Sequence, residues 1–236
     1  MLSQELISQP MTERMGPIRN KANSEELLVH EIYTSVQGES SYMGLPCIFI
    51  RTTGCHLRCS YCDTAHAFFE GKSYSLDYII NKISLMNIKL VELTGGEPLL
   101  QKASFTLLER LVNLGYTTLV ETSGAVSIKN INKKVKVILD IKTPSSGESL
   151  KNYYPNLDIL WPGCEVKFVI GSLEDYEFAK NICERYSLYD RTHVLFSPIV
   201  ARINPAMLAD KIVEDKLKVR FQMQLHRVLF GEMPGK

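Results

Sequence analysis

The chain has 236 residues, 45% of them hydrophobic, which suits one sizeable core and therefore a single domain. Its 27 Lys and Arg nearly balance its 26 Asp and Glu, so the net charge of +1 gives no field for binding nucleic acid or an anionic membrane. Because no apolar run approaches the roughly 18 to 20 residues of a membrane span and the polar N-terminus lacks signal-peptide character, we expect a cytosolic protein with a small substrate.

The first predicted segment, residues 1–27, has no helical or strand periodicity, and we interpret it as a mobile extension or a cloning remnant. From Leu28 onward, short β-branched runs alternate with longer amphipathic segments, which is typical of βα units on a parallel sheet. Six strands are predicted, at 47–52, 90–94, 117–121, 135–141, 165–170 and 193–196. Helices are predicted at 76–86, 100–114, 173–186 and 205–217, where apolar residues recur three and four apart.

The fold class is therefore α/β, and we expect a partial, irregular (β/α)6 TIM-like barrel with mostly parallel strands. The irregularity is expected at residues 124–134, which are too few for a helix. Polar residues gather directly after the strands, at Cys55, 94–97, 121–123, 140–142 and Ser197. Because loops from distant parts of such a chain converge at the carboxyl ends of the strands, we expect the functional site there.

Three cysteines, Cys55, Cys59 and Cys62, lie within eight positions, and the other three are widely separated. In a reducing cytosol such a cluster indicates metal ligands or catalytic groups. The other three, Cys47, Cys164 and Cys183, are interpreted as ordinary buried thiols. A structural zinc site and a cubane iron–sulfur cluster each use four protein ligands. Three thiolates leave one iron open to a chelating cofactor, such as S-adenosylmethionine (SAM). A zinc-binding interaction module without catalysis stays open as an alternative.

The Cys55-x3-Cys59-x2-Cys62 spacing, with Tyr61 before the last cysteine, resembles the signature of the radical SAM superfamily. Thr94-Gly-Gly-Glu-Pro98 resembles the second motif of that superfamily, a glycine-rich turn whose backbone meets the methionine moiety. The resemblance implies a [4Fe–4S] cluster held by the three cysteines, and SAM as the source of a 5'-deoxyadenosyl radical that abstracts hydrogen from the substrate.

Upstream, residues 31–39 (EIYTSVQGE), Gly44-Leu-Pro46 and Arg51 resemble 7-carboxy-7-deazaguanine synthase, and the similarity runs from about Leu28 to Phe230. The resemblance implies one radical SAM domain over residues 28–236, a lyase that contracts the ring of 6-carboxy-5,6,7,8-tetrahydropterin and releases ammonia on the way to queuosine, a modified base of tRNA. It also implies Mg²⁺, an electron donor such as flavodoxin, and a homodimer.

The same resemblance assigns residue roles. Expected substrate-binding residues are Val36, Gln37, Gly38, Glu39, Arg51, Thr94 and His226, the last as part of a Gln224-x-His226 segment that closes over the pterin. The guanidine-like edge of the pterin needs an acceptor from the protein, such as the carboxylate of Glu39. The carboxylate of the substrate suits the paired N–H donors of Arg51. Expected cofactor-binding residues are Tyr61, Cys62, Asp63, Gly96, Asp140, Ile141, Lys142 and Ser197. The Thr64 hydroxyl is the expected Mg²⁺ ligand, and a helix N-cap is its structural alternative.

Two other interpretations remain for these patterns, the zinc-binding module named above and a glycyl-radical enzyme activase. A glycyl-radical enzyme activase is a radical SAM enzyme of similar size, but it predicts neither the Gln-Gly-Glu motif nor a magnesium threonine. Residues 231–236 match no family pattern, so no role is assigned to them. Each motif alone also has an ordinary explanation, since Gln-Gly-Glu suits a hairpin turn and a lone histidine is more often structural.

Overall fold

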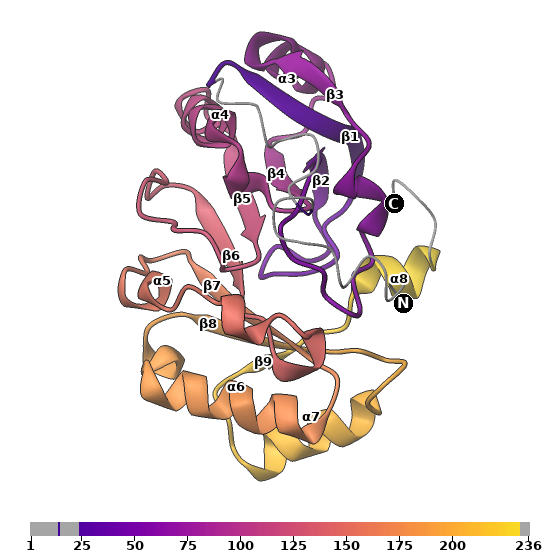
Figure 1. The fold of residues 1–236 in the computed structure, drawn as a ribbon, viewed down its shortest axis with the longest axis vertical. Coiled ribbons are helices and arrows are strands. Elements are labelled where there is room, and N and C mark those ends of the chain that lie inside the picture. Colours follow the sequence, from indigo (N-terminus) through magenta and orange to yellow (C-terminus); the bar gives the residue numbers. More distant parts are fainter. Residues whose placement is uncertain (1–13, 15–23, 232–236) are drawn as a thin grey trace.

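The computed structural model describes residue 14 and residues 24–231, so most of the predicted N-terminal extension and the last five residues lie outside the described residues (Figure 1). Within the described part the chain forms one nine-stranded sheet in the order β3-β1-β2-β4-β5-β6-β7-β8-β9. The strands are β1 (Glu26–Val36), β2 (Pro46–Thr52), β3 (Lys72–Ser75), β4 (Leu90–Gly95), β5 (Thr117–Thr122), β6 (Lys136–Asp140), β7 (Glu165–Ile170), β8 (His193–Pro198) and β9 (Arg220–Phe221).

All neighbours from β2 to β9 are parallel, whereas β1 pairs antiparallel with β2 and with β3. The prediction of a mostly parallel α/β fold is therefore confirmed, and the six predicted strands are β2 and β4 to β8. The count of six was wrong, because nine strands occur among the described residues. β3 (KSYS) is short and polar and β9 has two residues, so neither has a period that sequence patterns detect.

All but the last of the helices cover the outer face of the sheet, and the last one packs on the segment around Gly38 (Figure 1). They are α3 (Leu76–Ser84), α4 (Lys102–Asn113), α5 (Pro155–Asp158), α6 (Leu173–Arg185), α7 (Pro205–Glu214) and α8 (Leu225–Phe230), with 3-10 turns η2 (Ala65–Phe68), η3 (Pro98–Leu100), η4 (Pro144–Ser146), η5 (Ser149–Lys151) and η6 (Leu188–Asp190). Side-chain caps begin several of them. Ser172 accepts from the amide of Asp175, and Asn204 accepts from the amide of Ala206 ahead of α7. Residues 124–134 form turns without a helix, as predicted.

Alternate residues of each parallel strand face either the helices or the concave side of the sheet. The outward set, such as Val91 and Leu93 of β4, joins the large core under the helices. The inward set is apolar at the amino ends of the strands, where Phe49, Leu90 and Leu119 pack together. Farther along the same strands the inward set becomes polar, so the carboxyl ends carry the side chains available for chemistry.

No helix in the described ranges is both long enough and apolar enough to cross a membrane.

Candidate active site at the carboxyl ends of the strands

The three cysteines lie in a loop that leaves the carboxyl end of β2. Cys55 and Cys59 are buried and Cys62 is half-buried, and all six cysteines of the chain are free thiols. Arg58, which is also buried, organises the loop: its guanidinium lies 4.1 Å from the ring centre of Phe68, and its Nη1 donates to the Cys55 carbonyl at 2.9 Å. The loop therefore has a fixed backbone around the thiols.

Burial makes these thiols hard to ionise. It raises the pKa of Cys59 to about 12 and raises the pKa of Cys62, and burial with the nearby Glu97 charge raises the pKa of Cys55 as well. Without a cation the three groups are therefore neutral, and a metal that binds them must displace protons. A bound cation would add to the positive charge of Lys142, which only partly offsets the effect of burial on Cys59 and Cys62.

The spacing of the three sulfurs distinguishes the two metal centres considered for this loop. Tetrahedral Zn²⁺ at about 2.3 Å from each sulfur would hold them about 3.8 Å apart. Among the described residues only His30, Glu31 and His66 form a group of three His, Cys, Asp or Glu ligands whose donor atoms all lie within 4.8 Å of one another, so the thiols are spread more widely. The arrangement fits a multinuclear cluster better than a single zinc ion.

The glycine-rich turn after β4 packs directly against the cysteine loop. A Cβ on Gly96 would lie 2.9 Å from the Cys55 Cβ and would overlap the Gly54 carbonyl. Gly95 has a φ of +142°, and a Cβ there would overlap the backbone of Thr52. Both positions require glycine, because any side chain would push the turn away from the loop.

Glu97 anchors this turn to the next strand. Its carboxylate is fully buried and accepts four hydrogen bonds: from the Leu99 amide at 3.0 Å, the Thr122 hydroxyl at 2.8 Å, the Ser123 amide at 2.7 Å and the Ser123 hydroxyl at 2.5 Å. All its acceptor sites are used within the protein. Glu97 is therefore a positioning residue for the turn.

The inner face of the sheet carries a buried ionic network centred on Lys167 of β7. The Lys167 ammonium contacts Glu39, lies 2.6 Å from Glu121 and lies 3.8 Å from Asp140, while Lys142 lies 2.8 Å from Asp140. Burial by itself lowers the pKa of Lys167, but the neighbouring carboxylates outweigh it and raise that pKa well above the usual range. The network presents more carboxylates than ammonium groups to the interior.

Glu92 lies at the centre of β4 in the same interior. Burial, with the negative charges of Glu121 and Glu39, raises the pKa of Glu92 well above its usual value. The side-chain amide of Gln37 donates to this carboxyl group, and the Gln37 carbonyl accepts from the Glu39 amide at 2.7 Å. The predicted Gln-Gly-Glu motif is thus held by Glu92 as an inward-facing group.

Arg51 closes another side of the interior. Its Nε donates to Glu31 at 2.7 Å and its Nη2 donates to the Tyr33 hydroxyl at 2.7 Å. Within the described ranges its Nη1 has no hydrogen-bond partner. The arginine is oriented by two groups and keeps one donor nitrogen for another acceptor.

The C-terminal helix α8 packs on the Gln-Gly-Glu segment. The Leu225 amide donates to the Gly38 carbonyl at 2.9 Å, and Gln224 donates to Glu39 at 2.7 Å. A Cβ on Gly38 would overlap the ring of His226, which shows how closely the two segments meet. Arg227 pairs with Asp63 at 3.4 Å, so α8 also reaches the cysteine loop.

The structure brings most of the sequence-predicted site residues to this end of the sheet. Thr94, Asp140 and Ser197 are buried near the carboxyl ends of β4, β6 and β8. Val36 differs, because β1 is antiparallel and Val36 pairs with Pro46 at the amino end of β2. Tyr61 packs with the cysteine loop. Ile141 differs, because its side chain joins the core under the helices and only its backbone is near the network, with its amide donating to the Lys167 carbonyl at 2.9 Å.

Thr64 stands at the N-cap position of η2, but its hydroxyl makes no capping bond. The hydroxyl oxygen lies 3.7 Å from the Cys62 sulfur. The hydroxyl thus has a weak hydrogen bond with this sulfur, and its oxygen keeps a lone pair for another ligand.

Comparisons with known proteins agree with this geometry. Residues 49–201 match the family model of the Radical SAM superfamily. The 7-carboxy-7-deazaguanine synthase of Koribacter versatilis is 42% identical over 217 residues, covering 86% of this chain and 96% of its own length. That of Chlorobaculum tepidum is 36% identical over 208 residues, covering 87% and 94%.

The chain belongs to the 7-carboxy-7-deazaguanine synthase family. It is a radical SAM enzyme, and the crystal structure of QueE from Escherichia coli shares its fold, with a TM-score of 0.67 at 20% identity over 85% of this chain and 95% of that one.

Membership of this family implies a [4Fe–4S] cluster and SAM, and the residues present fit both. The three widely spaced cysteines fit the cluster, which binds them as thiolates. For SAM, the Asp140 carboxylate receives Lys142 on Oδ2, while its Oδ1 is buried with no hydrogen-bond partner among the described residues. A buried acceptor without a donor suits a ligand hydroxyl or amine.

Sequence reasoning placed Glu121 among the polar residues at the ends of the strands, but it missed Glu92 and Lys167 and gave none of the three a partner. Each is a charged residue within an otherwise apolar or β-branched strand, in LVELTG, TTLVET and EVKFVI. A charge in the middle of a strand that is covered on one face must point to a polar interior or to a partner. A charged residue in the middle of a strand is therefore the sequence signal that identifies such positions.

A separate hollow of about 480 Å³ lies near the amino ends of β7 and β8, lined by residues such as Cys164, His193 and Lys218. It is at the opposite end of these strands from the cysteine loop. It brings together none of the residues of the candidate site.

Proposed function

We propose that this chain converts 6-carboxy-5,6,7,8-tetrahydropterin into 7-carboxy-7-deazaguanine with release of ammonia, in a pathway to queuosine-type deazapurines. The observation that carries the proposal is the carboxylate-rich inner face, which lies between the cysteine loop and the Gln-Gly-Glu segment. Such a surface suits the guanidine-like edge of a pterin, which offers several N–H donors.

In this proposal Cys55, Cys59 and Cys62 hold the cluster, and the bound cluster and SAM supply one-electron, hydrogen-abstracting chemistry. The protein contributes binding and orientation. The backbone at Gly96 is available beside Cys55 for the amino group of SAM, since no side chain stands there. Asp140 and Ser197 would receive the polar groups of SAM, and the tight loop around Tyr61 and Asp63 would line its adenine.

Substrate binding would use both ends of the pterin. Glu39, which Lys167 and Gln224 hold in place, would accept from the guanidine-like edge, with Thr94 and the backbone of Val36 to Gly38 beside it. Arg51 would receive the carboxylate through its free donor nitrogen. His226, packed against Gly38, would cover the bound ring.

We also propose that the Thr64 hydroxyl and the substrate carboxylate together bind Mg²⁺. The support is that Thr64 makes no capping bond and only a weak hydrogen bond with the Cys62 sulfur at 3.7 Å, so its hard oxygen can still bind a cation. A hydroxyl is a weak ligand alone, so the site would be complete only with substrate present.

The remaining proposals follow from the family. We infer one radical SAM domain over residues 28–236, supported by the single sheet that runs from β1 to β9. We further infer a homodimer, a one-electron donor such as flavodoxin and a cytosolic location, the last consistent with six free thiols.

Product analysis tests the function directly. Cluster-loaded protein is incubated without oxygen with SAM, reductant, Mg²⁺ and the carboxylated pterin, and the products are identified by mass spectrometry. Formation of 7-carboxy-7-deazaguanine supports the proposal. Cleavage of SAM without that product would leave the radical machinery intact and refute the substrate, which would favour a glycyl-radical enzyme activase.

A further inference from the structure

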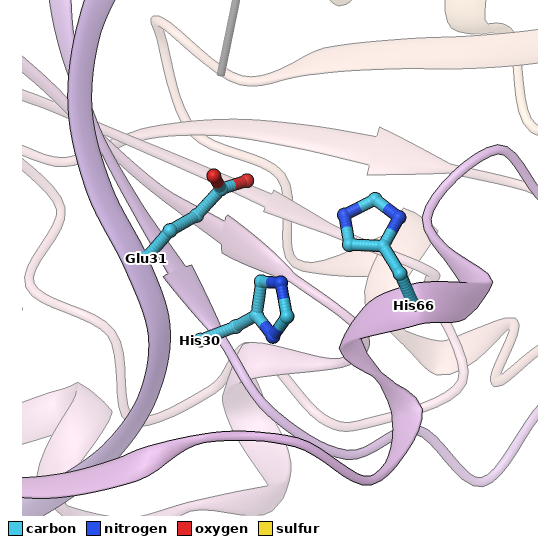
Figure 2. A group of neighbouring side chains, drawn as sticks. All are labelled: His30, Glu31 and His66. Atoms are coloured by element: carbon cyan, nitrogen blue, oxygen red, sulfur yellow. The ribbon is translucent and has the colours of Figure 1, made fainter. Parts of the chain in front are cut away.

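A second group of metal-ligating side chains adjoins the site described above, with which it shares only Glu31, the partner of Arg51. His30 and Glu31 of β1 and His66 of η2 each place a ligand atom within 4.8 Å of the other two (Figure 2). The two imidazole rings are 5.0 Å apart between centroids and inclined at 54°. Figure 2 shows both rings and the carboxylate turned toward a common space.

The backbone of β1 is shaped to make this possible. His30 and Glu31 are neighbours in sequence, so in a regular strand their side chains would point to opposite faces. The pairing register of β1 with β2 shifts between Val29 and Glu31, which makes His30 the extra residue of a β-bulge. A bulge re-aims a side chain. Here it brings His30 to the same side as Glu31.

Neighbouring groups also orient two of the three ligands. The Nδ1 of His30 lies 2.8 Å from the Glu70 carbonyl, which can only accept, so Nδ1 carries the hydrogen and Nε2 of the neutral ring keeps a free lone pair. Arg51 holds Oε1 of Glu31 at 2.7 Å and leaves Oε2 for another partner. A backbone carbonyl on the far nitrogen of a histidine is a usual support of metal-binding histidines.

We propose that His30, Glu31 and His66 bind one divalent transition-metal ion of the Zn²⁺ type, at a site distinct from the cysteine cluster and from the proposed Mg²⁺ site. Two imidazoles and one carboxylate favour Zn²⁺, Fe²⁺ or Ni²⁺ over Mg²⁺, which prefers oxygen ligands. His30 and Glu31 are half-buried and His66 is exposed, so an ion can reach the site from solvent.

The metal would join two segments that are distant in sequence. His66 belongs to the turn directly after the cysteine loop, and His30 and Glu31 belong to the strand next to β2. An ion bound to all three would tie η2 to β1 and would stabilise the folded state, since the unfolded chain does not hold these ligands together.

The charges around the group are compatible with a dication. Arg51 contributes an unfavourable positive charge, but it is already paired with Glu31. The negative charges of Glu31 and Asp63 both act at His66 against the positive charge of the arginine. Three protein ligands also leave coordination positions for water, so the site requires no further side chain.

The test uses untagged, cluster-loaded protein under anaerobic conditions, with Zn²⁺ as the probe and Mg²⁺ in large excess. Equilibrium dialysis measures the affinity and stoichiometry for Zn²⁺, and X-ray absorption at the zinc edge identifies the ligand atoms without interference from iron. We expect one Zn²⁺ per chain with nitrogen and oxygen ligands, and a rise in the thermal unfolding midpoint.

The variants are His30→Gln and His66→Gln, with His193→Gln as a matched control, because His193 is exposed at the start of β8. Each ligand variant should weaken Zn²⁺ binding by more than about tenfold, and the control should not. Because His66 is exposed on a turn, His66→Gln should fold even if His30→Gln, at the β-bulge, does not. Zinc–sulfur scattering near 2.3 Å, unchanged affinity in His66→Gln, or no Zn²⁺ retained against Mg²⁺ would overturn the proposal.

Discussion

Replacing Glu97 with glutamine tests whether the glycine-rich turn depends on this buried anchor. In the native protein Oε1 accepts from the Leu99 amide and the Thr122 hydroxyl, and Oε2 accepts from the amide and hydroxyl of Ser123. The NH₂ group of a glutamine would face two of these donors, whichever oxygen it replaced. A hydroxyl can rotate to accept, but a backbone amide cannot.

The loss can be estimated from these contacts. The lost hydrogen bond from a backbone amide to a charged acceptor contributes about 1.5–3 kcal/mol, so Glu97→Gln should lower the free energy of unfolding by about that amount. This is a substantial share of a typical total of about 5–15 kcal/mol. Anaerobic urea denaturation followed by far-UV circular dichroism measures the change in unfolding free energy.

Glu184→Gln is the matched control, because Glu184 is an exposed glutamate on α6 and its replacement should change stability by less than about 0.5 kcal/mol. A loss below about 1 kcal/mol in Glu97→Gln would refute the anchoring role.

Four further outcomes follow. Cys59→Ala should lose the iron of the cluster, measured by iron content and visible absorbance, together with all turnover; retained iron would contradict the ligand assignment. Thr64→Ala should keep the cluster but weaken the Mg²⁺ dependence of product formation, and an unchanged Mg²⁺ response would remove Thr64 as a ligand. Gly38→Ala should push His226 outward and raise KM more than it lowers kcat, whereas unchanged KM would mean that the helix does not cover the substrate. Glu92→Gln should flatten the pH dependence of the free energy of unfolding. In the wild type the folded state keeps a proton on Glu92 that the unfolded chain loses near pH 4.5, so stability falls as pH rises above that value. Urea titrations that show the same slope against pH in both proteins would contradict the raised pKa.

The sequence predicted the parallel part of the fold because β2 and β4 to β8 are buried runs of apolar residues, separated by helices with a clear period. β1 was missed as a strand although ELLVHEIYTSV is long, because its polar residues and its bulge at His30 obscure a two-residue alternation. Helix α8 has six residues and forms on the surface of the Gln-Gly-Glu segment, so tertiary packing rather than local periodicity defines it.

The site was predicted where chemistry is encoded by short spacing, as in the three cysteines and the paired glycines. It was not predicted where side chains meet only through the fold. Lys167 pairs with Glu39 across 128 positions, and His66 approaches β1 from the far side of the cysteine loop. Local sequence patterns do not show which residues far apart in the chain meet in the fold. A lysine within a buried strand does indicate that an acidic partner exists.

The central claim is that the cysteine loop and the carboxylate-rich interior act on one carboxylated pterin. The most direct measurement compares wild-type protein with Cys59→Ala in the anaerobic assay and follows 7-carboxy-7-deazaguanine and ammonia over time. The account predicts that both products accumulate together in the wild type and that neither forms in the variant. Product in the variant, or SAM cleavage in the wild type without 7-carboxy-7-deazaguanine, would contradict it.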